Sequence, residues 1–480
     1  MQKYLKYALF SLSIISISTG CTSINAPAIS LAHEATLSGN YRVAAIESDK
    51  EKDLESELDE SNQLQTLYAG NSYLYANDYK NSLKRLDEAE RIIKYHDEKI
   101  LLGSTGDLIA QLLLNDTVVD YHATMTDAII VNTYKAIDYM ALGKMDEARV
   151  ELNRAIDRQR RAKETYSALI NKQNEAISQK ETDEKAKIAS NRTSDKRKKS
   201  TLSLDISKTI GNSEIDKMLA NKYPTLNQFE KYPEFINPFT NYLAGIFFAT
   251  QKDYIKSADI LKEVHGMTPN SKAVKADLVM VENILDGKKK RINNVWIIYS
   301  NGLAPKKEEF RVDVPLFLFT NKVLYTGIAL PKMVTQNLAT KNLTVFNKDK
   351  LISTTQSFAS MDRVILTEFQ YGYRDVVTRT LFSTLIKTYL QYQLQEELGQ
   401  YAGLALGLFQ ALTTRADTRT WENLPKEYQI SRITMPKDKR LELKVGTQSI
   451  NIDLGLAQNA IVFVRMPSAL SQVSYTLIRL

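Results

Sequence analysis

Apolar residues recur at the spacing of a helix through residues 62–286. Three segments of this region can be aligned with one another, because each has a small residue, an aromatic residue three positions later, and then a matching series of small and large apolar residues. These segments are 69–89, 136–155 and 244–264. Small residues let two helices approach closely and large residues fill the space beside them, so the pattern predicts pairs of antiparallel helices.

The three segments resemble the tetratricopeptide repeat, in which two antiparallel helices occupy about 34 residues. Pro269 stands where that repeat places its helix-ending proline, whereas Lys94 stands there in the first copy. The alternative is a set of ordinary amphipathic hairpins, whose cores give a similar spacing. A stack of such repeats leaves a concave surface that typically binds peptides or other proteins. The candidate contact residues on it are Tyr73, Tyr139 and Tyr242.

Strand patterns replace the helical pattern after residue 291. Val295–Tyr299 is a continuous apolar run, and Phe310–Val314 alternates apolar and polar residues with period two. Further strand patterns lie on both sides of a helical stretch at 361–412. This order predicts an α+β domain at 292–480, with helices on one face of an antiparallel sheet. The fold class expected for the whole chain is α+β and predominantly α, with the irregular tetratricopeptide-like hairpins first.

The composition changes between the second and third repeat-like segments. Residues 171–205 are rich in Gln, Glu, Lys, Ser and Asn, and include a basic cluster at 192–199. We interpret this stretch as a charged, flexible excursion from the helical domain, because like charges repel and few apolar residues are available for burial. A basic patch for anionic lipid, lipopolysaccharide or peptidoglycan is the alternative interpretation.

The first residues have the pattern of a secretory signal. Lys3 and Lys6 precede an apolar run at 7–17, which is too short for a membrane-spanning helix of ~20 residues. Ser18–Cys21 then places small residues before the only cysteine of the sequence. This segment resembles the lipobox of bacterial lipoproteins, although Ser18 replaces the preferred leucine. The resemblance implies cleavage before Cys21 and its acylation, and several acyl chains form a stable anchor. The alternative is a spare thiol in an ordinary signal peptide.

The same resemblance implies a location. Thr22 stands where an aspartate would retain a lipoprotein at the inner membrane, so we expect a lipid anchor in the outer membrane and a protein that faces the periplasm. Residues 1–20 would then be the signal peptide, and the polar, acidic stretch at 21–61 would be the lipidated cysteine and a tether. The net charge of +7 is spread over 480 residues, so no nucleic-acid partner is expected.

Longer motifs resemble one family. They are Asn237–Phe239 with Tyr242–Gly245, Asn301–Pro305, and Asp417–Trp421 followed by Leu424 and Pro425. They are similar to an uncharacterised family of Gram-negative outer-membrane lipoproteins, which combine an irregular tetratricopeptide-like half with a C-terminal α+β half. The similarity covers nearly the whole mature chain. The family carries no agreed activity, so the resemblance implies location and architecture but no catalytic residues.

Catalytic signatures are absent from the sequence: it contains no GxSxG, HExxH, Walker or GxGxxG motif. None of the four histidines has a second histidine at i+3 or i+4, so neither a metal site nor a cofactor is expected. Asp417, Arg419 and Trp421 are the best candidates for a polar interaction site, because the Asp and Arg would share one face of an extended segment and the Trp could stack on a sugar or a peptide. The alternative is an ion pair and a buried Trp that hold a loop on the sheet.

These features favour a lipid-anchored scaffold or adaptor of the cell envelope, without enzyme activity, that binds other periplasmic or outer-membrane proteins through its repeats. A second hypothesis is a lipoprotein that binds peptidoglycan or another glycan through Trp421 and the basic runs. A third is an enzyme of cell-wall metabolism, which requires polar residues to converge in a pocket. The residues to examine for such convergence are Asp417, Arg419, Arg379 and Lys387.

Overall fold

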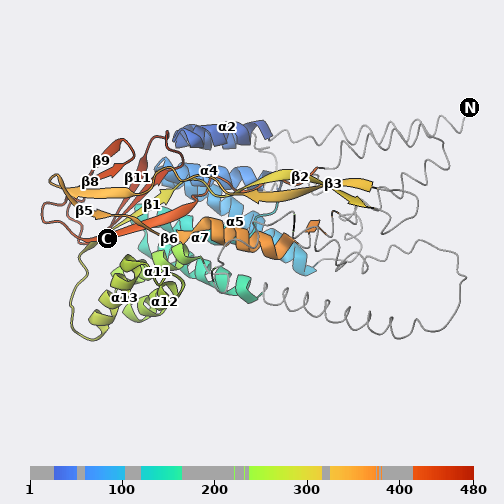
Figure 1. Cartoon of the computed structure of the whole chain (residues 1–480). Coiled ribbons are helices and arrows are strands. Elements are labelled where there is room, and N and C mark those ends of the chain that lie inside the picture. Colours follow the sequence, from blue (N-terminus) through green and yellow to red (C-terminus); the bar gives the residue numbers. More distant parts are fainter. Residues whose placement is uncertain are drawn as a thin grey trace, which may run out of the picture.

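The computed structural model describes residues 26–50, 60–102, 121–164, 237–315, 325–373 and 415–480, together with a few isolated positions. The expected signal peptide, Cys21 and the charged excursion at 171–205 lie outside the described residues. Within them, the expected α+β fold with a predominance of helix is confirmed (Figure 1).

The three aligned segments form antiparallel helix pairs. The first pair is α4 (Gln63–Tyr75) with α5 (Tyr79–Leu102), the second is α7 (Met125–Ala141) with a helix at 145–164, and the third is α11 (Pro238–Thr250) with α12 (Tyr254–Met267). The turns that join the helices of each pair share one conformation. One residue of each turn has a positive φ, and the N–H of the residue after it donates to the carbonyl five residues earlier in the chain, at 2.8 to 2.9 Å. The positive-φ residues are Asn77, Gly143 and Lys252. The aligned sequences predicted the antiparallel pairs that these turns connect.

The small residues of the first and third pairs lie where the helices almost touch. The Ser82 hydroxyl donates to the Gly70 carbonyl at 2.9 Å, and the Ser257 hydroxyl donates to the Gly245 carbonyl at 2.7 Å. A Cβ atom at Gly70 would lie 2.6 Å from Cδ2 of a leucine on the partner helix, and one at Gly245 would lie 2.7 Å from its counterpart. Neither position has room for a side chain.

Gly70→Ala and Gly245→Ala are therefore each expected to lower the free energy of unfolding by about 1–3 kcal/mol, the usual cost of overpacking a core. Gly266→Ala in α12 is the matched control, because nothing lies within 4 Å of its added Cβ. That variant is expected to be neutral or slightly more stable. Urea unfolding of the three variants is the measurement, and equal stabilities for all three would contradict close packing at Gly70 and Gly245.

A further helix pair precedes these three, where the sequence indicated a tether. α2 (Ala26–Leu37) and α3 (Tyr41–Asp49) are joined by a similar turn at Gly39, whose φ is 78°. This corrects part of the expected tether at 21–61, because residues 26–37 and 41–49 are helical. The inward-facing residues of the pair are mostly small, such as Ala32 and Ala44. After the third pair, α13 (Lys272–Leu285) completes the series of helices.

A five-stranded sheet lies at the centre of the molecule, in the order β11 (Ser474–Arg479), β10 (Ala460–Met466), β1 (Asn294–Asn301), β7 (Glu427–Thr434) and β6 (Gln356–Ser360). The sheet is mixed, because β1 pairs with β10 in parallel and every other pair is antiparallel. The expected antiparallel pairing thus holds for every strand pair described except β1 with β10. β1 is buried along its entire length, which explains its uninterrupted apolar run.

The two faces of this sheet are covered by different layers. Ile297 and Val462 face a second sheet of four strands, whereas Trp296 and Phe463 face the helices. The second sheet runs in the order β5 (Lys350–Thr354), β4 (Leu343–Asn347), β8 (Arg440–Val445) and β9 (Gln448–Asp453). A two-stranded ribbon of β2 (Lys306–Pro315) and β3 (Tyr325–Val334) extends away from these layers, as Figure 1 shows.

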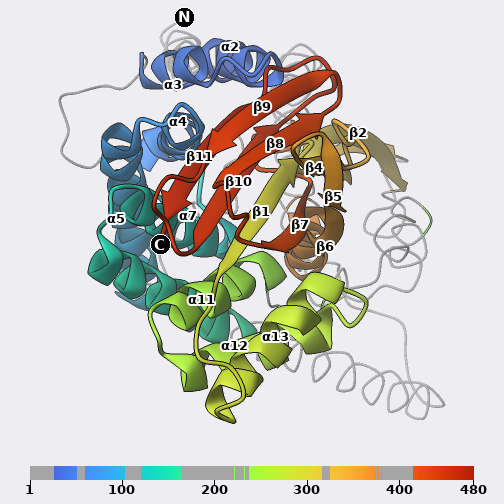
Figure 2. The ribbon, with the colours of Figure 1, turned by 90° about the vertical axis from the view of Figure 1, so that its left-hand side faces the viewer.

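One hydrophobic core joins the helices to the five-stranded sheet. It contains residues from α4, α7, α11, α12 and α13 together with residues from β1, β7, β10 and β11. Figure 2 shows the helix pairs following one another around the sheet, and contacts between the elements place α4 and α7 at β11, α11 at β6 and α13 at β7. The region at 62–286 and the region at 292–480 therefore pack against each other through one continuous core.

Candidate functional site

The chain's own sheet covers the surface that a stack of repeats would offer to a partner. Almost every residue of α4, α7 and α11, the first helices of the three pairs, is buried. Tyr242 of α11 is fully buried, and its hydroxyl donates to Asp277 Oδ2 at 2.5 Å. We therefore correct the expectation for Tyr242, which is a core residue and cannot contact a partner in this structure.

Tyr73 and Tyr139 are partly exposed. The Tyr73 hydroxyl donates to Asp49 Oδ2 at 2.9 Å, and Asp49 also forms an ion pair with Arg85 Nε at 2.9 Å. Burial, together with the hydrogen bond to Asp49, raises the pKa of Tyr73 to about 12. Tyr73 thus links α4 to α3 and α5. Tyr139 packs against the edge of the core, where burial raises the pKa of its hydroxyl. Both remain accessible at their edges.

Asp417 and Arg419 meet as the sequence indicated. Arg419 Nε lies 2.9 Å from Asp417 Oδ1 and Arg419 Nη2 lies 3.1 Å from Asp417 Oδ2, so the ion pair is bidentate. The same segment is bound to strand β2, because the Ala416 N–H donates to Glu309 Oε2 at 3.0 Å and Lys307 Nζ donates to the Arg419 carbonyl at 3.1 Å. The ion pair therefore fixes the conformation of a loop docked on the ribbon.

Trp421 is buried, and its ring packs edge-on against Tyr134 of α7 with the ring centroids 6.0 Å apart. This corrects the expectation that Trp421 stacks on a sugar or a peptide from outside the protein. The structure instead matches the alternative of an ion pair and a buried Trp that hold a loop on the sheet. Arg379 and Lys387, the other residues proposed to converge with this segment, lie outside the described residues.

The next residues complete what we call the seam, defined as residues 416–426. The Asn423 carbonyl accepts from Asn71 of α4 at 3.1 Å and from Arg465 of β10 at 3.2 Å. The Leu424 carbonyl accepts from the Ala304 N–H at 2.8 Å. The seam thus contacts the helices, the ribbon and the five-stranded sheet, which accounts for its dense set of polar and aromatic residues.

Arg465 is a buried cation at the centre of the molecule, with 1% of its surface exposed. Its Nη1 donates to the carbonyls of Ser300 at 3.1 Å and Gly302 at 2.5 Å, and its Nη2 donates to the Asn423 carbonyl. The guanidinium carbon lies 5.4 Å from the centroid of the Tyr75 ring. Among the described residues no carboxylate forms an ion pair with it. Backbone carbonyls and an aromatic face therefore replace water around this charge.

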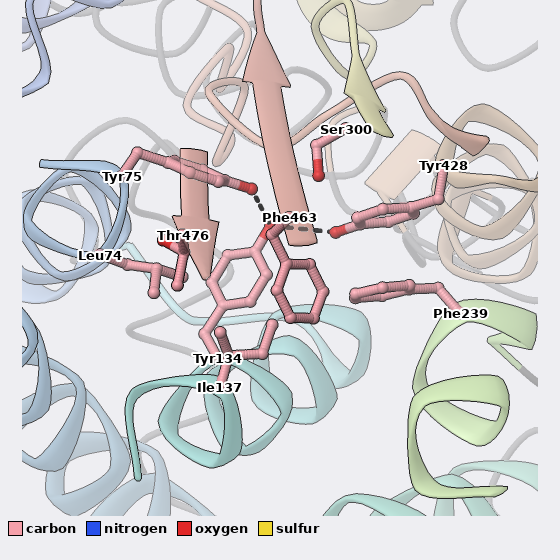
Figure 3. A pocket seen from close by; sticks show the side chains of 9 residues that line it. All are labelled: Leu74, Tyr75, Tyr134, Ile137, Phe239, Ser300, Tyr428, Phe463 and Thr476. Carbon is pink, nitrogen blue, oxygen red and sulfur yellow. Dashed lines mark hydrogen bonds between the residues drawn. The ribbon is translucent and has the colours of Figure 1, made fainter. Parts of the chain in front are cut away.

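A narrow cavity lies between the helices and the sheet (Figure 3). The hydroxyls of Tyr75 and Tyr134 are 3.3 Å apart, and those of Tyr134 and Tyr428 are 3.0 Å apart. The ring of Phe239 stacks on Tyr428 with a centroid distance of 3.5 Å. Burial raises the pKa of Tyr134 and of Tyr428 well above the ordinary value, so both hydroxyls stay protonated at neutral pH. The other residues lining the cavity are Leu74, Ile137, Ser300, Phe463 and Thr476.

A second buried charge network joins three helices. Lys135 Nζ of α7 lies 2.6 Å from Glu90 Oε2 and 2.8 Å from Asp87 Oδ1, both on α5, and 3.0 Å from Glu151 Oε1 on the helix at 145–164. Burial favours the neutral carboxyl of Glu90, but the hydrogen bond and charge of Lys135 outweigh it and lower the pKa of Glu90 to about 2. Burial likewise opposes the charge of Lys135, yet the three carboxylates raise its pKa.

A third buried charge links helices to the sheet. Asp277 of α13 accepts hydrogen bonds from Tyr242 of α11 and from Trp296 Nε1 of β1, the latter at 3.0 Å, and lies 2.6 Å from Arg432 Nε of β7. Burial raises the pKa of Asp277, although the charge of Arg432 and the hydrogen bonds lower it in part. Asp277 Oδ2 accepts both hydrogen bonds and Oδ1 faces Arg432, so this residue connects two helices with the sheet.

No motif or spacing in the sequence described above pointed to these three buried charges. Arg465 follows five apolar residues of β10, and Lys135 stands between Tyr134 and Ala136 in α7. A single charged residue at an inward position of a strand or helix predicts a buried polar network, because a charge is buried only where hydrogen bonds or opposite charges compensate it.

No helix of the described residues is long and apolar enough to span a bilayer. The same residues bring together no group of three or more His, Cys, Asp or Glu side chains suited to hold a metal ion. No model of a known protein family, no curated protein and no solved structure matches this chain.

Proposed function

We propose that this protein is a lipid-anchored scaffold or adaptor of the outer membrane that faces the periplasm and binds other envelope proteins. The observation that carries the proposal is the sequence Ser18-Thr19-Gly20-Cys21 after a short apolar run, placed five residues before the first described helix. The body behind this anchor supports a binding role, because its helix pairs form a long array on one side of a packed sheet.

The partner would bind to the outward-facing helices, since the sheet covers the inner side of the array. Large apolar side chains are exposed on these helices, notably Ile255 of α12, which is 71% exposed, and Val150 of the helix at 145–164. Arg149 and Lys256 lie over the ring of Phe248 beside them. Isolated exposed apolar residues are common, but here they are on neighbouring pairs, which Arg149 and Asp253 join through an ion pair at 3.1 Å. The glycan alternative is weakened by the burial of Trp421.

The first experiment tests the anchor. Mass spectrometry of the N-terminal peptide and fractionation of cells would compare the natural protein with Cys21→Ser. We expect an acylated protein in the outer membrane and a variant released from it, because several acyl chains hold a protein stably at a bilayer. A Cys21→Ser variant that remains lipidated and membrane-associated would contradict the proposal.

The second experiment tests partner binding. A photoreactive amino acid placed at Ile255 is expected to give adducts with a defined envelope protein in intact cells. The matched control is Leu351 of β5, which is also exposed but lies on the second sheet. Adducts from neither position, or the same set from both, would count against an interaction surface on the outward helices.

A further inference from the structure

A short turn between β10 and β11 presents apolar side chains to solvent. The Ser471 N–H donates to the Ser468 carbonyl at 3.1 Å, and the Ser471 hydroxyl donates to the same carbonyl at 2.8 Å, which closes the turn. Ala469 and Leu470 form its tip, and Leu470 is 95% exposed. The conformation of the turn therefore holds a large apolar side chain away from the core.

Neighbouring elements fix this turn on both sides. The Ser468 hydroxyl donates to the Leu37 carbonyl at 2.8 Å, and the Gln472 N–H donates to the Ser38 carbonyl at 3.0 Å, so the turn is bonded to the junction of α2 and α3. Gln448 of β9 donates to the Ser471 carbonyl at 2.8 Å. These bonds hold the tip of the turn in a defined position relative to α2 and α3.

The α2–α3 pair carries further exposed apolar residues. Leu31 of α2 and Val43 and Ile46 of α3 are all exposed, and the two residues on α3 are one helical turn apart. We call the set of Leu31, Val43, Ile46, Ala469 and Leu470 the terminal apolar surface. Exposed Arg42 lies beside Val43 on α3, and a basic residue beside apolar ones suits the headgroup region of a bilayer, whereas Lys50 at the end of α3 is paired with Glu47.

The distance from the expected anchor restricts what can cover this surface. Cys21 is five residues before Ala26, where α2 begins, so a fully extended chain between them spans at most about 18 Å. α2 and α3 are also fixed to the rest of the protein, since Tyr41 packs against Tyr75 of α4 with a centroid distance of 5.5 Å. An acylated Cys21 would thus keep Ala26, the first residue of α2, within that distance of the lipid headgroups, and the 12 residues of α2 extend about 18 Å from there to the junction with α3.

We propose that the terminal apolar surface docks on the lipid bilayer that holds the acylated Cys21, and so sets the orientation of the whole protein. This inference rests on the proposed lipid anchor. The surface is too small to recruit the protein to a membrane by itself, so its role is to orient a body that the acyl chains already hold. The β9–β10 loop, at the other end of β10, would then point away from the membrane.

The test uses the acylated full chain in vesicles of phosphatidylethanolamine and phosphatidylglycerol. Cys21 is the only cysteine, and acylation blocks its thiol, so Leu470→Cys provides a single site for an environment-sensitive fluorophore. Leu456→Cys is the matched control, because Leu456 is 102% exposed and lies in the β9–β10 loop. We expect a blue shift of the emission and quenching by spin-labelled lipid at position 470, and neither effect at position 456.

Mass spectrometry of the same samples separates the two proposals. An acylated, vesicle-bound protein whose label at 470 is neither shifted nor quenched would overturn the docking inference and leave the lipid anchor intact. Contact of the surface with a second copy of the chain, detected as crosslinks between labels at 470, would also overturn it. A chain that is not acylated at Cys21 would overturn both proposals. Val43→Ser and Ile46→Ser in the labelled protein are expected to reduce the quenching at 470 without releasing the protein.

Discussion

Arg465→Met is expected to lower the free energy of unfolding by about 3 kcal/mol or more. The guanidinium donates to three carbonyls in the interior, and a buried polar group left without its partner costs about 1–3 kcal/mol. Removing a buried charge offsets part of this cost, but methionine offers no donor to any of the three carbonyls. The seam also loses one of its two bonds at Asn423.

Urea unfolding followed by the fluorescence of Trp296 and Trp421 is the measurement. Arg479→Met on the neighbouring strand β11 is the control, because Arg479 is exposed and donates to carbonyls near the surface. That change is expected to cost about 0.5 kcal/mol or less.

Arg465→Lys keeps the charge but not the planar set of donors, so its stability should resemble that of the methionine variant if hydrogen-bond geometry is decisive. A methionine variant as stable as the control would refute the bonding role of Arg465.

Lys135→Met is expected to lower the free energy of unfolding by about 3–5 kcal/mol at neutral pH, the usual cost of leaving buried charges without their partner. Glu90 and Glu151 are both buried, and without Lys135 the cations nearest to them are Arg154 and Arg158 together with the mostly exposed Lys94, while Asn132 still donates to both carboxylates. Lys94→Met is the matched control. Lys94 Nζ also lies near Glu90, at 3.6 Å, but its side chain is mostly exposed, so a loss of about 0.5 kcal/mol is expected.

The pH dependence of the Lys135→Met variant gives a second readout. In the natural protein the pKa of Glu90 is lowered to about 2, so its contribution to stability is present above its unfolded pKa and is lost as the pH falls toward 2. Without Lys135, the dominant effect on Glu90 is burial, which favours the protonated form. The difference in stability between the two proteins should therefore shrink as the pH is lowered from 7. A difference that stays constant with pH would show that lost packing, and not charge, causes the effect.

The local architecture was more predictable than the contacts between distant segments. Small residues at Gly70 and Gly245 and the aligned positions around them were enough to predict three helix pairs, because helix contact and spacing leave a direct imprint on sequence. The α2–α3 pair was not predicted, since its contacts depend on alanines, which occur equally in exposed helices. The parallel pairing of β1 with β10 joins strands far apart in the chain, and no local pattern encodes it.

The same distinction applies to the candidate site. The ion pair of Asp417 and Arg419 followed from their spacing in an extended segment, but the burial of Trp421 depends on Tyr134, which is remote in sequence. The sequence did contain an indication that the chain's own sheet covers the inner side of the helix array. α11 contains apolar residues around its whole circumference, and a helix of this kind is packed on more than one side.

The separation between β1 and β10 has a consequence for biosynthesis. The N–H of Asn294, the first residue of β1, donates to Oδ1 of Asn459, which directly precedes β10, and the two residues are 165 positions apart in the chain. α7 and α11 are complete long before β10 is translated, so their apolar faces stay uncovered while the remaining residues are being synthesised. Long-range pairings of this kind form slowly and expose chains to aggregation. Folding of this protein should therefore depend on a chaperone that covers these helices until the last strands are complete.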